Sequence, residues 1–226
     1  FLTTGEIRNA INMPSLDAAA LSELGGYLDI ARALGKLLAK LGPANPDSLR
    51  VSYHGALAEK DTALISRSVL CSFLEAARCD GQINIVNAPG VAKELGLDLI
   101  ESTINAKTEY SELLVAELSK GDEKFRVSGT MIGTSARIVE INKLYLDINI
   151  IGNFLIVRNN DRPGIVGAVG TALGNAGANI ANLSLARNLQ ENNALTMIEL
   201  DSPVSTEIME EINGITGVTQ ATGITL

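Results

Sequence analysis

The chain has no tryptophan, a single histidine and few aromatic residues, which make up 4% of its 226 residues. Its hydrophobic content is nevertheless 46%, so the apolar side chains are mainly aliphatic. This composition is typical of α/β layers packed by aliphatic side chains. The length suffices for one large domain or two small ones, and we expect two.

Basic residues are also scarce, and the formal net charge is -8. Nucleic-acid binding relies on clustered Lys and Arg, so the balance argues against a nucleic-acid partner. From residue 152 onward three arginines stand against seven acidic residues, so an anionic ligand there must be held by local contacts. No apolar run of about 18 residues and no signal-peptide pattern is present, so we expect no membrane partner and a cytoplasmic location.

Cysteine and histidine offer little chemistry. Cys71 and Cys79 are eight residues apart on an expected helix, two turns from each other and too far apart to form a disulfide. We interpret both as buried structural thiols, which favours a reducing compartment. His54 ends an expected strand and is interpreted as a structural or surface residue. With one histidine and no paired-cysteine motif, we expect no metal ligands.

The first part of the chain alternates helical and strand-like patterns. Apolar residues with a helical period predict a long helix over residues 16–41, and a second helix is predicted over 61–77. Gly121 and Asp122 predict a hairpin turn. The strands are predicted over residues 48–55, 83–90, 97–105, 111–119, 124–133, 135–142 and 144–150, with a helical turn over 91–96. The result is a helix-plus-sheet domain that ends near Ile150.

The remainder of the chain has a more regular pattern. Strands are predicted over 152–159, 178–187, 193–201 and 217–226, and helices over 163–176 and 204–213. This βαββαβ order is the ferredoxin-like plan, an antiparallel sheet with two helices on one face. The fold class predicted for the whole chain is therefore α/β (α+β).

The stretch "NNDRPGIVGAVG", residues 159–170, joins the first strand and helix of that βαββαβ unit. Pro163 suits the first position of a helix, which would leave the N–H groups of Gly164, Ile165 and Val166 free to bind a carboxylate. Asn159 and Asp161 should lie on the same side if the strand's period of two persists.

Asn179 opens the next strand, and we expect its side chain opposite Asn159 and Asp161. This set suits a zwitterion, with the carboxylate at the helix start and the ammonium at Asp161. The two amides would bind either group or a polar side chain. No His, Cys or Lys lies nearby, so we expect no catalytic residue. Simple turn and cap chemistry is an alternative role for Asp161 and Asn159, and the residues alone leave both open.

Three glycines follow in the helix, Gly167, Gly170 and Gly174. Their spacing is not G-x-G-x-x-G, and no Gly-Lys-Ser/Thr follows, so we expect no cofactor-binding residues. We interpret the glycines as allowing the helix to approach the sheet or a second subunit. Arg126, Arg137 and Lys143 form either a basic cluster or an ordinary solvated face, and we favour the solvated face.

These motifs resemble a known family. The stretch 159–170, with Asn179 in "GANIANLSLAR", resembles the ACT domain of D-3-phosphoglycerate dehydrogenases. The segments "NAINMPSLD", "LGGYLDIARALGKLLAKL", "VSYHGALAEKDT" and "INIVNAPGVAKELGL" are similar to the intervening, or allosteric-substrate-binding, domain of the long form of that enzyme. The opening "FLTTGEIRNAINMP" resembles the exit from its catalytic half. We therefore expect residues 1–12 to be the end of a catalytic half, 13–150 the intervening domain and 151–226 the ACT domain.

The resemblance implies NAD-dependent oxidation of 3-phosphoglycerate in serine biosynthesis, with L-serine as a feedback inhibitor. The serine site would comprise Asn159, Asp161 and Asn179 with the backbone at Gly164 and Ile165, in a homo-oligomer formed through ACT-domain pairing. Arg137 falls near a family position that helps bind an anionic effector, and Asn149 replaces a second, basic position. The family's NAD fingerprint and catalytic Arg, Glu and His are not in these residues, so we expect a regulatory fragment with neither activity nor cofactor of its own.

Two alternatives remain. The β chain of iron–sulfur L-serine dehydratase resembles the same two-domain order, but its Ser-Ser-Ser-His-type stretch is absent and "NAINMP" fits the dehydrogenase better. A stand-alone amino-acid-sensing protein is the other alternative. The start at Phe1 rather than Met, and the opening that resembles a catalytic half, count against it.

Overall fold

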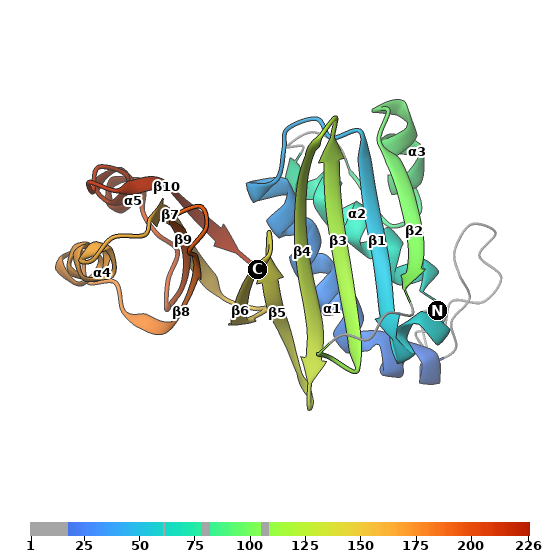
Figure 1. The fold of residues 1–226 in the computed structure, drawn as a ribbon. Helices are drawn as coiled ribbons and strands as arrows, with labels where there is room; N and C mark the ends of the chain where they lie inside the picture. The colour runs from blue at the N-terminus through green and yellow to red at the C-terminus, as the bar shows by residue number, and fades with distance from the viewer. Residues whose placement is uncertain (1–17, 61, 78–81, 105–108) are drawn as a thin grey trace. The chain divides into compact units, whose positions relative to one another are not determined.

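The computed structural model describes residues 18–60, 62–77, 82–104 and 109–226 (Figure 1). The chain divides into two compact units, Phe1–Asn142 and Lys143–Leu226. The expected catalytic-half segment, residues 1–12, and Cys79 lie outside the described residues. The domain boundaries at residues 12 and 150 stay predictions.

The first unit places helices over one face of a sheet. Its helices are α1 (Ala18–Leu41), α2 (Ala63–Ala77) and α3 (Ala88–Glu94), with a short 3-10 helix η1 (Ala56–Glu59). The strands are β1 (Ser48–Gly55), β2 (Asp98–Ile104), β3 (Glu112–Lys120), β4 (Glu123–Ile132) and β5 (Ser135–Ile141), while β6 (Leu144–Asn149) belongs to the second unit. The strands of the first unit follow the order β2-β1-β3-β4-β5, in which β1 and β2 are parallel and β1 and β3 antiparallel. The predicted helix-plus-sheet plan is confirmed, including the hairpin at Gly121.

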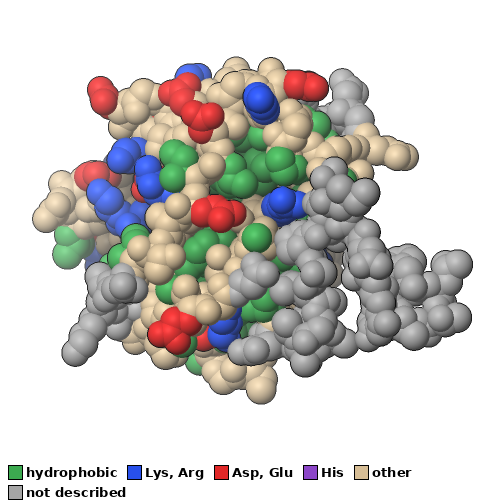
Figure 2. Space-filling model, turned by 90° about the vertical axis from the view of Figure 1, so that its right-hand side faces the viewer, with side chains coloured by type: hydrophobic (Ala, Val, Ile, Leu, Met, Phe, Trp, Pro, Cys, Tyr) green, Lys and Arg blue, Asp and Glu red, His purple; other side chains and the backbone are tan. Residues whose placement is uncertain are grey.

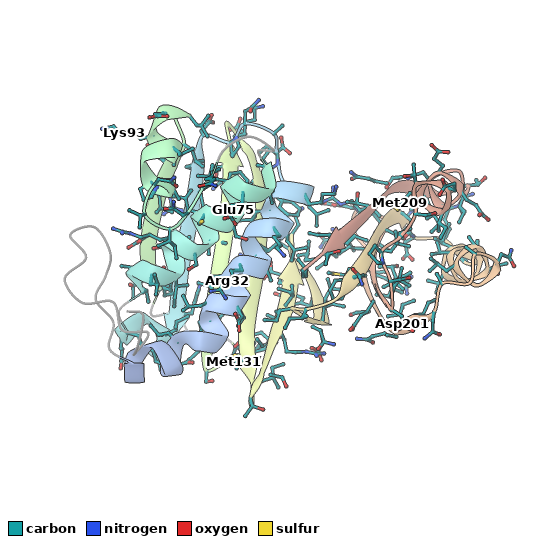
Figure 3. The ribbon with its side chains drawn as sticks, turned by 180° about the vertical axis from the view of Figure 1, so that it is seen from behind. Arg32, Glu75, Lys93, Met131, Asp201 and Met209 are labelled. Carbon is teal, nitrogen blue, oxygen red and sulfur yellow. The ribbon has the colours of Figure 1, made fainter. Side chains whose placement is uncertain are left out.

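The two long helices pack closely against each other over this sheet (Figure 3, where Arg32 on α1 and Glu75 on α2 are labelled). Leu34 and Leu38 of α1 are fully buried. At Gly35 a Cβ atom would lie 2.6 Å from the carbonyl oxygen of Val69 on α2. The hydroxyl of Ser72 donates to the carbonyl of Arg32 at 2.9 Å. The contact therefore depends on a residue without a side chain at position 35.

The strand predicted over residues 83–90 is wrong. Residues 85–87 form a turn and α3 begins at Ala88, so the helical turn expected over 91–96 also starts earlier. The side-chain oxygen of Asn84 accepts hydrogen bonds from the N–H groups of Val86 and Asn87 at 2.9 and 3.0 Å. This local bonding favours a turn, and Pro89 suits the first turn of the helix that follows.

The second unit has the predicted βαββαβ order. Its elements are β7 (Asn153–Asn160), α4 (Ile165–Asn175), β8 (Ile180–Asn188), β9 (Asn193–Leu200), α5 (Thr206–Asn213) and β10 (Val218–Thr225). The strands follow the order β10-β7-β9-β8, each antiparallel to its neighbours. Both helices share one apolar core with the sheet, which includes Leu155, Val157, Val169, Leu173, Ile198 and Ile212. The α+β prediction is confirmed.

Alanine at Gly35 should destabilise the first unit. Because its Cβ would overlap the α2 backbone, we expect Gly35→Ala to lower the free energy of unfolding by about 1–3 kcal/mol. Gly25→Ala, on the same helix, should raise the same free energy by about 0.5–1 kcal/mol, because Gly25 has no described atom outside its own helix within 4 Å of the added Cβ. Urea unfolding followed by circular dichroism checks both, and equal effects at the two positions would contradict the close packing.

The thiol of Cys71 should be unreactive in the folded chain. Burial raises its pKa to about 11, with a further contribution from Glu75. Because the thiolate is the reactive form, we expect alkylation at pH 8 to be ~100-fold slower in the folded chain than in the unfolded one. A Cys79→Ser variant, which leaves one thiol, allows the rate to be measured with iodoacetamide. Similar rates in buffer and in urea would contradict the prediction.

Candidate functional site

The candidate site lies at the end of β7, where three other parts of the second unit meet. The backbone N–H of Asp161 donates to the carbonyl of Asn192, in the hairpin between β8 and β9, at 3.0 Å. The N–H of Asn160 donates to the carbonyl of Gly217, just before β10, at 2.9 Å. The start of α4 follows in sequence. These bonds hold residues 160 and 161 in place between two loops.

The prediction that Pro163 begins the helix is wrong. Gly164 has the left-handed conformation, with φ 93° and ψ -16°, and α4 begins at Ile165. A Pro followed by a residue with positive φ is typical of the two central positions of a type II turn. The carbonyl of Gly164 accepts the hydrogen bond of Ala168 at 2.9 Å. The helix start therefore comprises the N–H groups from Ile165 onward, and Gly164 belongs to the turn before it.

Asn159 is buried, with 5% of its surface exposed. Its side-chain N–H group donates to the carbonyl of Asn160 at 2.7 Å. Its Oδ1 atom is buried and has no hydrogen-bond partner among the described residues. A buried acceptor without a partner costs about 1–3 kcal/mol. This oxygen is therefore well placed to accept a donor from a ligand.

Asp161 forms an ion pair that the sequence analysis missed. Its Oδ2 atom accepts from both Nε and Nη2 of Arg187 on β8, each at 2.7 Å. The hydrogen bonds to the Asp161 carboxylate, and then the negative charge of that carboxylate, raise the pKa of Arg187. The available signal was the position of Arg187 at the end of the predicted strand "NLSLAR", but without the strand order nothing connected it to Asp161.

The expectation that Asn179 lies opposite Asn159 and Asp161 in the same chain is wrong. Strand β9 lies between β7 and β8, and β8 pairs with β9 alone in this sheet. Asn159 is opposite Ala194 near the start of β9, whereas Ile180, next to Asn179, is opposite Leu200 at its end. Six residues of strand separate these positions by about 20 Å. Asn179 instead donates to Asp201, the residue after the end of β9, at 2.7 Å (Asp201 is labelled in Figure 3).

Arg126, a basic residue of the first unit, has a local partner. Its side chain is 36% exposed and forms an ion pair with the buried Glu140 at 2.5 Å. The solvated face expected for Arg126, Arg137 and Lys143 stays a prediction. Burial, followed by the charge of Arg126, lowers the pKa of His54. Arg137, on β5, lies opposite Thr130 of β4 and is half-buried. Figure 2 shows acidic, basic and apolar side chains intermingled on the face drawn there.

The predicted anionic-effector site stays a prediction. Arg137 belongs to the first unit and Asn149 to the second. The side chain of Asn149 donates to Glu199 on β9 at 3.0 Å.

Within the described ranges, no group of three or more His, Cys, Asp or Glu side chains is arranged to hold a metal ion. In the same part of the chain, no helix is both long and apolar enough to cross a membrane.

Known families match both units. Residues 153–217, which carry the candidate site, match the family model of the ACT domain. A βαββαβ unit with this site therefore defines an ACT-domain protein. Residues 23–142, more than half of the chain, match the model of the D-3-phosphoglycerate dehydrogenase intervening domain. The chain belongs to the D-3-phosphoglycerate dehydrogenase family and corresponds to its C-terminal regulatory region.

Several curated relatives of this chain are D-3-phosphoglycerate dehydrogenases. The chain is 29% identical to D-3-phosphoglycerate dehydrogenase of Archaeoglobus fulgidus, over 97% of this chain and 42% of the relative. It is 28% identical to the Bacillus subtilis protein of that name, over 92% of this chain and 40% of the relative. The Mycobacterium bovis protein is 32% identical over 84% and 36% of the two chains. The chain thus spans about two fifths of the length of these relatives.

The turn before α4 should require glycine. Among the described residues, no atom beyond the chain neighbours lies within 4 Å of a Cβ at Gly164, so its left-handed backbone is what opposes a side chain there. We expect Gly164→Ala to lower the free energy of unfolding of the second unit by about 1–2 kcal/mol. Gly164→Asn should lower the free energy of unfolding by less, because Asn tolerates the left-handed conformation better than Ala does. Urea unfolding of the two variants checks the order, and a smaller loss for Ala than for Asn would contradict it.

Proposed function

We propose that this chain is the regulatory part of an NAD-dependent D-3-phosphoglycerate dehydrogenase and binds L-serine as a feedback inhibitor. The observation that carries this proposal is the set of groups at the end of β7. The carboxylate of Asp161, the buried Oδ1 of Asn159 and the start of α4 are joined there by short chain segments. Such groups recognise the ammonium and carboxylate of a small amino acid. The family match supports the same role.

The described residues do not fit NAD. The turn between β7 and α4 has glycines at 164, 167 and 170, which lack the G-x-G-x-x-G spacing that lets a backbone approach a pyrophosphate. The strand before it belongs to an antiparallel sheet. We therefore place oxidation of 3-phosphoglycerate in other parts of the parent enzyme.

The serine site, in this proposal, is shared between two chains. Asp161 and Asn179 are about 20 Å apart along the sheet of one chain, too far to contact one small amino acid. Strand β8 is an edge strand, and two such edges pair most simply in antiparallel order about a two-fold axis. The start of β8 in one chain then lies beside the end of β8 in the other. Asn179 of the partner subunit thereby approaches Asp161.

The surface beside β8 suits such a pairing. Leu183 and Leu185 point to the helix side of the sheet but are 37% and 43% exposed. At Gly167, Gly170 and Gly174 no atom of the described chain lies within 4 Å of a Cβ. The interpretation that these glycines let the helix approach its own sheet is therefore wrong. The other interpretation, that they let a second chain approach the helix, stays a prediction.

Serine bound across two chains would act through their relative orientation. A ligand that contacts both chains stabilises the orientation in which Asp161 and the partner subunit's Asn179 are close. It shifts the population toward that orientation by as much as its affinity differs between orientations. Inhibition in the parent enzyme then follows if that orientation disfavours catalysis.

Calorimetric titration of the chain with L-serine tests this function. We expect saturable binding that Asp161→Ala and Asn179→Ala each weaken at least about tenfold, since each removes a charged or amide partner of the ligand. Circular dichroism of each variant controls for folding. Unchanged affinity in both variants would overturn the assignment of this site.

Mixing the two single variants tests whether the site is shared. A mixed dimer has one site with both Asp161 and the partner subunit's Asn179, so unfolding and refolding the variants together should restore about a quarter of the wild-type sites. Mixing Asp161→Ala with the double variant supplies no Asp161 and should restore none. If the mixture of single variants also binds nothing, the site is not built from two chains.

A further inference from the structure

Arg187 reaches the candidate site from two strands away. In the register of the sheet, Arg187 on β8 is opposite Ala194 on β9, and Ala194 is opposite Asn159 on β7. Directly opposed residues share a face, so these three form one row on the helix side of the sheet. The small side chain of Ala194 leaves room for the long arginine side chain to cross β9. The guanidinium therefore reaches Asp161, two residues beyond Asn159.

The ion pair leaves part of both side chains available. Nε and Nη2 of Arg187 share the single oxygen Oδ2 of Asp161. A guanidinium usually pairs its fork of N–H groups with both oxygens of a carboxylate. The structure gives no hydrogen bond to Oδ1 of Asp161 from the described residues. The side chain of Arg187 is 55% exposed and that of Asp161 is 16% exposed, so a solute can reach the arginine.

We propose that Arg187, in addition to the N–H groups at the start of α4, binds the α-carboxylate of the amino-acid effector while Asp161 binds its ammonium group. This inference rests on the proposed function and adds the residue that selects for a zwitterion. Before binding, the two side chains neutralise each other. An α-amino acid carries both charges on neighbouring atoms, so it replaces one ion pair with two, and neither side chain loses a charged partner.

The proposal predicts which ligands are rejected. A molecule with an ammonium group and no carboxylate satisfies Asp161 but leaves Arg187 without its charged partner. The alternative role for Arg187 is to hold Asp161 in position without contacting the ligand. In that role the arginine would affect every ammonium ligand equally, whether or not it has a carboxylate.

Two probes separate these roles. L-serine carries ammonium, hydroxyl and carboxylate groups, and serinol replaces the carboxylate with a hydroxymethyl group. We expect the unmodified chain to prefer L-serine over serinol at least about tenfold in calorimetric titrations at pH 7. Arg187→Met should remove that preference by weakening L-serine at least about tenfold without weakening serinol, whose ammonium group then no longer competes with Arg187 for Asp161. Arg187→Lys should keep part of the preference, because it retains the charge without the planar fork.

Arg50→Met is the matched control. It removes the same charge from an exposed position on β1 in the first unit, and it should leave both affinities unchanged. Thermal unfolding of each variant monitors the fold. Equal weakening of L-serine and serinol in Arg187→Met would show that Arg187 only positions Asp161 and would overturn the proposal. Absence of L-serine binding to the unmodified chain would instead overturn the proposed function, and this inference with it.

Discussion

The arrangement of β7, β9 and β8 is the constraint on which the site depends. Strands β7 and β8 are both antiparallel to β9, which lies between them, so they run in the same direction, and residues that end β7 and residues that begin β8 lie at opposite ends of the sheet. The shared direction places the end of β8, with Arg187, at the same end of the sheet as the end of β7, with Asp161. The strand order also leaves β8 at the edge of this sheet. One feature of the strand order thus decides the composition of the site in one chain and the surface that a second chain would use.

Local patterns predicted most of the elements, and tertiary pairing explains what they did not predict. The aliphatic period of α1 and the βαββαβ order could be derived from the sequence because each depends on near neighbours. The strand expected over residues 83–90 failed because Asn84 bonds the local backbone more favourably than a sheet would. The helix start was misplaced by two residues, since Pro163 suits both a first helical turn and a type II turn.

In the candidate site, too, the sequence predicted the residues that are near neighbours along the chain and missed the one that tertiary pairing adds. Asn159 and Asp161 could be identified from the sequence because they are two residues apart on one strand. Arg187 is 26 positions away from Asp161, and only the strand order brings the two together. The charge balance after residue 152 indicated that an anion must be held by local contacts, and the structure supplies a local arginine with its counter-ion.

The bond between the Asp161 amide and the Asn192 carbonyl has a consequence for sequence variation. Tips of hairpins usually tolerate insertions, because they lie in solvent and hold nothing else in place. The hairpin between β8 and β9 instead presents one particular carbonyl to the backbone of the site. An added or deleted residue there would shift that carbonyl along the loop and release residue 161. We therefore expect the length of this loop to be restricted, while the side chains on its outer surface remain free to vary.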